Sequence, residues 1–455
     1  MLPTMFERGC TPSDCSISFA VIFGSSVTGR TSLRSSLFSM SGVLRRHGGA
    51  LALGVVSQML NSLTNFAIVL YLVRVLTKSE FGLYSIGFAA YLAIAAIVSA
   101  MFAVQYVVNN PGHAGDEKLV HALHHLAAVA VIVTLIMLVV AVLNFGIFSL
   151  VVQVEAEIFH ALLKLAFPVA LAVAGFSIRD MLVRIAYVER RECLVLGSAV
   201  TASVSAVLAF AAAYSFSVAT GAVMALILIA LGQIAGAIFV FALLGLPWRQ
   251  LSFGRLRQTF LEAWQGGRWH AMTSVVYSVR MQAHNFIILP IVGLSTLAEV
   301  NAARILLTPA VLVIPPLYQV VMPRLVERRG KGPVHMRRTT WLTVIGLVVF
   351  ALIYSAALLL TLDWTLPLTL GSEYAHLDTV VTAWCVFTVF LAARNGLTMG
   401  LEVRKEFRAL LEVNTVAALA AVALAAGLAM MWGGLGAVWA LTLAELILCL
   451  LLYRT

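Results

Sequence analysis

The sequence has few charged residues and few cysteines, and each scarcity excludes a class of protein. Only 11% of its 455 residues are Asp, Glu, Lys or Arg, about half of the share that a water-soluble domain carries. The five cysteines are scattered and odd in number, so they predict neither a metal site nor a disulfide framework. There is no glycine-rich loop of the kind that cradles phosphates, which argues against ATP hydrolysis. The sequence therefore predicts no metal and no cofactor.

The sequence consists largely of long apolar runs. Hydrophobic residues make up 61% of the chain and recur from end to end, which predicts an all-α integral membrane protein. We expect about twelve transmembrane helices. The first six are placed at roughly 50–73, 83–108, 121–145, 158–178, 194–214 and 219–246, and the second six at roughly 270–292, 297–322, 339–362, 376–396, 410–431 and 434–453.

The chain divides into an N-terminal extension and two lobes of six spans. Residues 1–44 are rich in Ser and Thr and are expected to be disordered, or to lie upstream of the true start at Met40. The lobes are 45–247 and 248–455, and they repeat weakly. Arg179-Asp180 after the fourth span matches Arg394-Asn395 after the tenth, at an offset of about 215 residues. Six spans in each lobe predict a parallel repeat, as in many secondary transporters.

Basic residues alternate between loops and predict the orientation. Every second loop holds several Arg and Lys, whereas the others hold only Arg74 and Lys78 beside several acids. By the positive-inside rule, both termini are cytoplasmic in a multi-pass plasma-membrane protein. The formal charge of +10 does not indicate a nucleic-acid partner, because it is spread over these short loops.

The cationic residues within the spans are the strongest functional signal. Tyr277, Arg280 and His284 recur at helical spacing on one face of the seventh span, as do Asn301 and Arg304 on the eighth. A charge at bilayer depth costs roughly 2.5–3.5 kcal/mol, so it usually faces protein or a water-filled cavity. The two stripes predict one cavity that attracts an anion. In the alternative interpretation, the arginines bond to carbonyls freed by nearby prolines or reach to the membrane surface.

Other polar residues within the spans have two interpretations each. Gln58, Asn61 and Asn65 share a face of the first span, where they bind sugar hydroxyls in the cavity or join helices by hydrogen bonds. Lys164 in the fourth span contacts the substrate or extends to the interface. Glu445 is the one acid placed well inside a span, and it either carries a coupling ion or is a structural partner for a polar neighbour.

The segment Val73–Tyr84 carries a family resemblance. Leu76 is followed by Glu80-Phe81-Gly82-Leu83-Tyr84, which resembles the turn between the first two helices of polysaccharide-unit flippases (O-antigen, capsule and exopolysaccharide). These flippases belong to the multidrug/oligosaccharidyl-lipid/polysaccharide exporter superfamily. The Arg-rich loop after the fourth span and its repeat after the tenth are also similar to that family. The resemblance covers about residues 45–455.

The resemblance implies a V-shaped pair of six-helix lobes around a central cavity, and no enzymatic activity. Such proteins flip undecaprenyl-diphosphate-linked oligosaccharides to the outer leaflet of the bacterial inner membrane, generally driven by an ion gradient. Arg280 and Arg304 are the positions expected to meet the diphosphate. The implied partners are the polyprenyl-diphosphate-linked oligosaccharide, the lipid bilayer, a polysaccharide polymerase and glycosyltransferases.

Two other functions are open at this point. One is a cation-coupled multidrug exporter of the same superfamily, a branch that commonly has an acid in its first helix. This chain has none between Gly49 and Val73, so Glu445 would have to be the working residue. The other is a membrane enzyme, which usually needs catalytic acids or metal ligands in its outer loops. The outer loops here are short and hold isolated acids.

Overall fold

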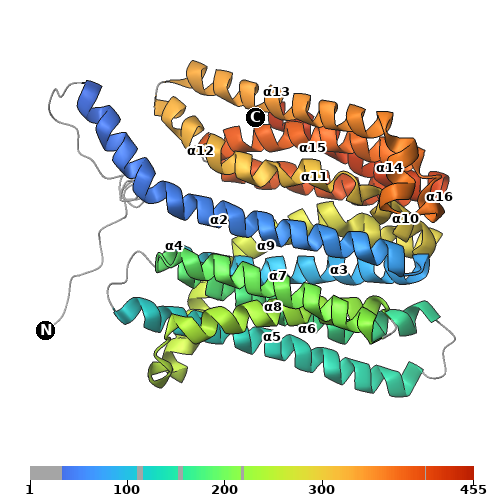
Figure 1. The fold of residues 1–455 in the computed structure, drawn as a ribbon, viewed down its shortest axis with the longest axis horizontal. Coiled ribbons are helices and arrows are strands. Elements are labelled where there is room, and N and C mark those ends of the chain that lie inside the picture. The colour runs from blue at the N-terminus through green and yellow to red at the C-terminus, as the bar shows by residue number, and fades with distance from the viewer. Residues whose placement is uncertain are drawn as a thin grey trace, which may run out of the picture.

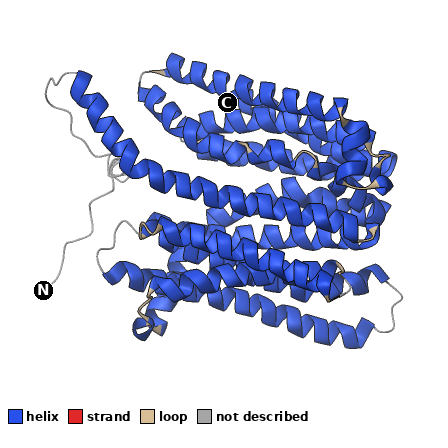
Figure 2. Ribbon diagram, viewed as in Figure 1, coloured by secondary structure: helices blue, strands red, loops and turns tan. Residues whose placement is uncertain are grey.

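The computed structural model describes residues 33–109, 116–151, 157–216, 220–330, 332–404 and 406–454, and these are helical with no strand among them (Figure 2). The prediction of an all-α membrane protein is therefore confirmed. Within the described residues, ten helical stretches are long and apolar enough to cross a bilayer. The expected extension over 1–44 is only partly covered: residues 1–32 lie outside the described part, and the first helix begins at Leu33.

The first bundle contains the helices from the N-terminal half. They are α2 (Leu33–Val75), α3 (Lys78–Val98), the π-helical turn η3 (Ser99–Ala103), α4 (Val104–Asn109), α5 (Asp116–Val151), α6 (Glu157–Val188), α7 (Glu192–Ser215) and α8 (Ala222–Leu244). Helix α6 packs against α3, α5 and α8, and α7 lies between α2 and α8. In Figure 1 these helices occupy the middle and lower part of the molecule.

The second bundle is built from the C-terminal half. Its elements are α9 (Phe253–Val292), α10 (Leu294–Ile305), α11 (Thr308–Leu312), α12 (Ile314–Gly330), α13 (Pro333–Leu360), α14 (Leu362–Thr369), η6 (Ser372–Tyr374), α15 (Asp378–Arg404) and α16 (Phe407–Arg454), and the short η5 (Trp248–Gln250) precedes it. Helix α15 packs against α13 and α16, and α16 packs against α9. Figure 1 shows α11 to α16 together at the top.

The expected eighth span, 297–322, is not one continuous helix. It is divided into α10, α11 and α12, with breaks at Leu306–Leu307 and Val313. Pro309 lies in the first turn of α11, where proline is tolerated because that N–H has no partner in the helix. The Tyr354 hydroxyl donates to the Leu306 carbonyl at 2.6 Å, which satisfies one backbone group left free by the break.

The last two expected spans form a hairpin within α16. Trp432 and Gly433 interrupt its helical geometry, and Gly433 has a φ of 59°, a conformation that glycine adopts without steric cost. The chain reverses there, so that Leu410 and Ala417 pack with Leu448 and Leu452. The broken span and this hairpin explain why ten long helical stretches stand where twelve spans were expected.

Helix α9 belongs to both bundles. Its 40 residues run without a break from Phe253 to Val292. Phe260, near the start, makes an edge contact with Phe102 of η3, with ring centroids 5.6 Å apart. The later turns pack against α16. One hydrophobic core then extends through both bundles, with buried residues from α2, α3, α6, α8, α9, α10, α15 and α16.

Candidate functional site

A cavity of about 290 Å³ lies where the two bundles face each other. Helices α2 and α3 of the first bundle form one wall, and α9, α10 and α11 form the other. Its polar lining consists of Ser62, Asn65, Ser85, Gln282, Asn285, Asn301, Arg304 and Thr308. Aromatic and aliphatic side chains complete it, among them Phe66, Phe81, Tyr84, Phe88 and Leu92. The cavity thus combines one guanidinium with several carboxamides and hydroxyls on an apolar background.

Arg304 supplies the positive charge of this cavity. It lies in the last turn of α10, directly before the break that starts α11. Its guanidinium carbon is 5.5 Å from the centre of the Trp384 ring, and the Trp384 indole N–H donates to the Val300 carbonyl at 2.9 Å. No described carboxylate forms an ion pair with Arg304. The indole therefore positions a guanidinium whose N–H donors are available to an anion.

A chain of carboxamides continues from Arg304 along the same wall. The Asn301 amide donates to the Asn285 side-chain oxygen at 2.8 Å, and the Asn285 amide donates to the Gln282 oxygen at 3.0 Å. These contacts tie α10 to α9. Because each carboxamide carries both donors and acceptors, the wall can form hydrogen bonds with hydroxyl-rich groups such as sugars.

Arg280 does not line this cavity. Its side chain is buried in the second bundle, where it forms an ion pair with Glu445 of α16. The other carboxylate oxygen of Glu445 lies 2.8 Å from Nε of Arg394 in α15. Tyr277 is half exposed, with its ring centre 5.4 Å from the Arg280 guanidinium. The structure thus separates the two arginines that the sequence analysis placed in one cavity, because Arg280 turns to the interior of its own bundle.

His284 is also enclosed by protein. Its ring is fully buried and meets Trp384 edge-on, with ring centroids 6.0 Å apart. His284 and Arg304 thus both contact the Trp384 ring. Among the described residues, no group of three His, Cys, Asp or Glu side chains could hold a metal ion.

The first bundle has a buried arginine of its own, and Asn61 contacts it. The Arg179 guanidinium donates to Asn61 at 2.9 Å, to Gln233 at 2.7 Å and to Ser198 at 3.0 Å. This network joins α2, α6, α7 and α8. A second cavity of about 280 Å³ borders it and includes Gln58, which is exposed. Asn61 and Gln58 thus do not line the cavity between the bundles, whereas Asn65 does. Asn61 and Asn65 together border a small pocket of about 10 Å³.

The two arginines that are paired in the expected repeat are both buried. Arg179 and Arg394 are about 215 residues apart, and each contacts a residue from the last helical segment of its own bundle, Gln233 or Glu445. The N-terminal network uses neutral amides, whereas the C-terminal one uses a carboxylate between two guanidiniums. Sequence analysis paired the two arginines but did not predict their partners. For Glu445, the sequence did contain a sign of such a partnership, because it is the one acid placed well inside a span.

Lys164 lies away from the cavities, and Trp384 is a site residue that the sequence analysis did not predict. Lys164 is exposed on α6 and is not among the residues that line either cavity described above. Trp384 was not singled out, because an aromatic residue in an apolar helix usually packs in the core. Its contact with Arg304 depends on how α15 and α10 meet, which helical spacing along one segment does not indicate.

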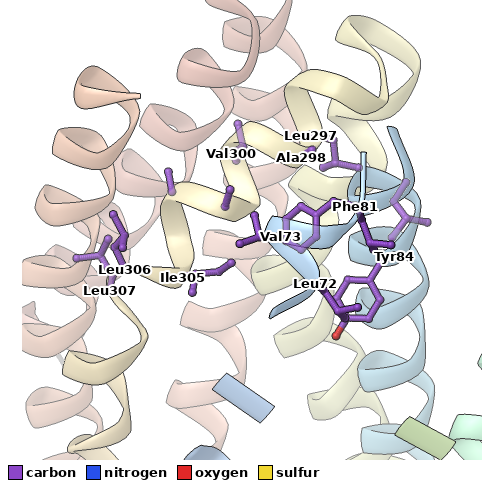
Figure 3. Packing of buried hydrophobic residues seen from close by; sticks show 14 of the residues in the cluster. Leu72, Val73, Phe81, Tyr84, Leu297, Ala298, Val300, Ile305, Leu306 and Leu307 are labelled. Carbon is purple, nitrogen blue, oxygen red and sulfur yellow. The ribbon is translucent and has the colours of Figure 1, made fainter. Parts of the chain in front are cut away.

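The bundles are joined at one end of the cavity by a close contact between α3 and α10. A Cβ atom added to Gly82 would lie 2.3 Å from the Leu294 carbonyl oxygen, so only glycine permits this approach. Phe81 lies next to Leu297, and Tyr84 lies further along α3 beside Leu72, all in the same hydrophobic cluster (Figure 3).

Polar contacts surround this closure. Lys78 forms an ion pair with Glu299 at 2.8 Å, and Arg74 donates to the Thr369 carbonyl at 2.9 Å. Glu80 accepts a hydrogen bond from the first N–H of α8 at 2.6 Å. Burial and the nearby Glu373 raise the pKa of Tyr374 to about 12, so its neutral ring faces the Lys78 ammonium at 5.4 Å. Glu80, Phe81 and Gly82, which carry the family resemblance, therefore each make a contact at this closure.

Comparison with known proteins shows the fold. No family model matches the chain, and no curated protein matches its sequence. Among solved structures, the lipid II flippase MurJ in an inward closed conformation has a TM-score of 0.69 at 12% identity, covering 88% of this chain and 86% of MurJ. An inward-facing multidrug resistance MATE transporter of the MOP superfamily has a TM-score of 0.71 at 14% identity, covering 87% and 93%.

The eukaryotic MATE transporter AtDTX14 is similar as well, with a TM-score of 0.64 at 16% identity over 90% of this chain and 95% of that one. The identities are too low to transfer an activity. What these similarities show is that the chain has the fold of the MOP superfamily across nearly its whole length.

Proposed function

We propose that this chain is a membrane transporter that flips lipid-linked oligosaccharides, carried on a polyprenyl diphosphate, from the cytoplasmic to the outer leaflet. The MOP-like fold supports a transporter, and a flippase for a lipid-linked substrate, MurJ, is among the proteins with this fold. The supporting observation within this chain is Arg304, a half-buried guanidinium on the wall of a cavity between two bundles, without a described acidic partner.

The chemistry of the cavity matches the two polar parts of such a substrate. A guanidinium forms charge-assisted, fork-shaped hydrogen bonds with phosphate oxygens, and these are stronger than neutral ones. The carboxamides of Asn285 and Asn301 can exchange their mutual hydrogen bond for bonds to sugar hydroxyls. The polyprenyl tail is apolar and can stay in the bilayer. Only the diphosphate and the sugars of the substrate, which do not enter hydrocarbon, then have to be bound in the cavity.

The test is flipping of a fluorescent polyprenyl-diphosphate-linked oligosaccharide in proteoliposomes. Arg304→Ala removes a charged hydrogen-bond donor worth roughly 1.5–3 kcal/mol, so we expect flipping to fall by about tenfold or more. Arg304→Lys keeps the charge but not the fork and should be intermediate. The matched control is Arg268→Ala, because Arg268 also lies against a tryptophan, Trp269 at 5.6 Å, but on exposed surface. Equal rates for Arg304→Ala and the control would refute the proposal.

A cation-coupled multidrug exporter is the second candidate, because MATE transporters have the same fold. That function requires an intramembrane acid that is free to exchange a cation. Glu445 was predicted as the coupling residue, and its carboxylate lies between Arg280 and Arg394. Each carboxylate oxygen faces a guanidinium, which would compete with a coupling cation for Glu445, so this arrangement favours the flippase over the exporter.

The setting of the protein in the cell belongs to the same proposal. We place the two lobes at 45–247 and 248–455 in the bacterial inner membrane, with both termini in the cytoplasm by the distribution of loop arginines. A polysaccharide polymerase and glycosyltransferases would be its partners in function, since one set of enzymes must build the lipid-linked unit and another must consume it. No catalytic role is assigned to any residue of this chain.

A further inference from the structure

A second basic cavity lies at one end of the C-terminal bundle, away from the cavity between the bundles. Its volume is about 270 Å³. Arg337 from the start of α13, Arg404 from the end of α15 and Arg454 from the end of α16 all line it. Three separate helices thus bring one guanidinium each to the same small space.

These three arginines have no described counter-charge. No ion pair joins any of them to a carboxylate among the residues that the structure describes. Neighbouring arginines at this end have partners: Arg329 donates to the Val403 carbonyl at 2.7 Å, and Arg408 pairs with Glu412 at 2.8 Å. Since like charges repel when they share one cavity, a ligand with negative charge would relieve the repulsion.

Most of the remaining lining is apolar, and the one hydroxyl of a threonine in it, that of Thr340, donates to the Met336 carbonyl of its own helix. Leu397 and Leu401 precede Arg404 by about two turns and one turn of α15, and Leu452 lies close to Arg454 in α16. Trp341 and Tyr453 meet edge-on at the wall, with ring centroids 5.9 Å apart. A cationic rim over an apolar floor, with Trp and Tyr at the boundary, is the pattern of a membrane interface.

We propose that this cavity binds the phosphate group of an anionic phospholipid, such as phosphatidylglycerol, from the adjacent leaflet. The guanidiniums of Arg337, Arg404 and Arg454 hold the phosphate, and the leucines contact the first part of the acyl chains. Basic pockets between transmembrane helices bind lipid headgroups in this way. A soluble phosphate shares the charge but makes no use of the apolar floor, which is why the lipid is favoured.

Native mass spectrometry of the purified full-length protein tests this proposal, with equal amounts of phosphatidylglycerol and phosphatidylethanolamine added. The wild-type protein should retain phosphatidylglycerol preferentially. In the triple variant R337Q/R404Q/R454Q, the retained phosphatidylglycerol should fall by about tenfold or more, with phosphatidylethanolamine unchanged. The matched control R249Q/R257Q/R338Q removes the same charge from exposed arginines outside the cavity, and it should behave as the wild type.

Three outcomes would overturn the proposal. Equal losses in the two triple variants would mean that binding follows total charge and not this cavity. No loss in R337Q/R404Q/R454Q, with the fold verified by its unfolding temperature, would mean that the cavity binds no lipid. Displacement of phosphatidylglycerol by inorganic phosphate alone would assign the site to a soluble anion. This experiment measures lipid binding and not transport, so the lipid site can be refuted without refuting the proposed flippase activity, and the reverse.

Discussion

Glu445 lies between two buried guanidiniums in the second bundle. Its side chain is 3% exposed, that of Arg280 is 1% exposed and that of Arg394 is 9% exposed. Together the three groups hold one net positive charge in a region that excludes water. Breaking a buried ion pair by removing one partner leaves an uncompensated charge, which is more destabilising than the intact pair is stabilising.

We therefore expect Glu445→Gln to lower the free energy of unfolding by about 3–5 kcal/mol. The measurement is thermal unfolding of the purified protein, with Glu373→Gln as the control because Glu373 is exposed in the short η6. If Glu445 is a coupling residue instead, Glu445→Gln will keep its stability and lose the dependence of transport on an ion gradient. Unchanged stability together with loss of the gradient dependence would contradict a purely structural role for Glu445.

The polar stripe on α9 shows what sequence could and could not predict at this scale. Helical spacing correctly placed Tyr277 beside Arg280, since the two are in contact. Spacing indicates which residues share a face, but not what that face meets. Arg280 meets Glu445, which is 165 residues further along the chain, and only the packing of α9 on α16 brings them together. Arg304 lies in the last turn of α10 and lines the cavity, and the end of α10 at this point was not predicted.

At the scale of elements, the contact between α3 and α10 controls how closely the bundles approach. Helix α3 begins with Thr77 as its cap, since the Thr77 hydroxyl accepts from the Glu80 N–H at 3.3 Å. Gly82 follows within the first two turns and touches the backbone of Leu294. The two helices meet backbone to backbone, so any added side-chain atom must push them apart.

We expect Gly82→Ala to destabilise this closure by about 1–3 kcal/mol, the usual range for an atom forced into a packed interface. Hydrogen exchange of the backbone amides over 294–300 should become faster. Gly346→Ala is the matched control, because a Cβ at Gly346 in α13 meets nothing within 4 Å. Unchanged exchange in Gly82→Ala would show that the bundles do not depend on this contact.

The helices differ from the expected spans mainly in where they begin and end. Most expected spans have a helix, because long apolar runs predict helices reliably. The eighth was expected as one helix and is three. The seventh span was expected at roughly 270–292, and the helix that contains it begins earlier, at Phe253. Hydropathy does not distinguish a helix that stops at the membrane surface from one that continues beyond it.

At the scale of the whole molecule, the distribution of charge predicts how the protein sits in the membrane. The loop at 371–377 holds Glu373 and His376 and no arginine, whereas the segment around η5 holds Arg249. An odd number of expected spans separates them, so we expect the two on opposite sides of the membrane. The positive-inside rule predicts that Arg249 is cytoplasmic.

Labelling with a membrane-impermeant thiol reagent on intact cells tests this orientation. In a variant without its native cysteines, Glu373→Cys should react from outside and Arg249→Cys should react only after the membrane is permeabilised. Both positions are exposed, so a difference between them reports the side of the membrane and not burial. The reverse pattern would invert the orientation and with it the direction proposed for flipping.

Helix α9 has a mechanical consequence for the proposed transport. Its 40 residues span about 60 Å, twice the thickness of the hydrocarbon layer. Near its start Phe260 contacts Phe102 of the first bundle, and further along Arg280 forms an ion pair with Glu445 of the second. A helix attached to both bundles couples their movements, so neither bundle can tilt alone unless α9 bends or one attachment is released.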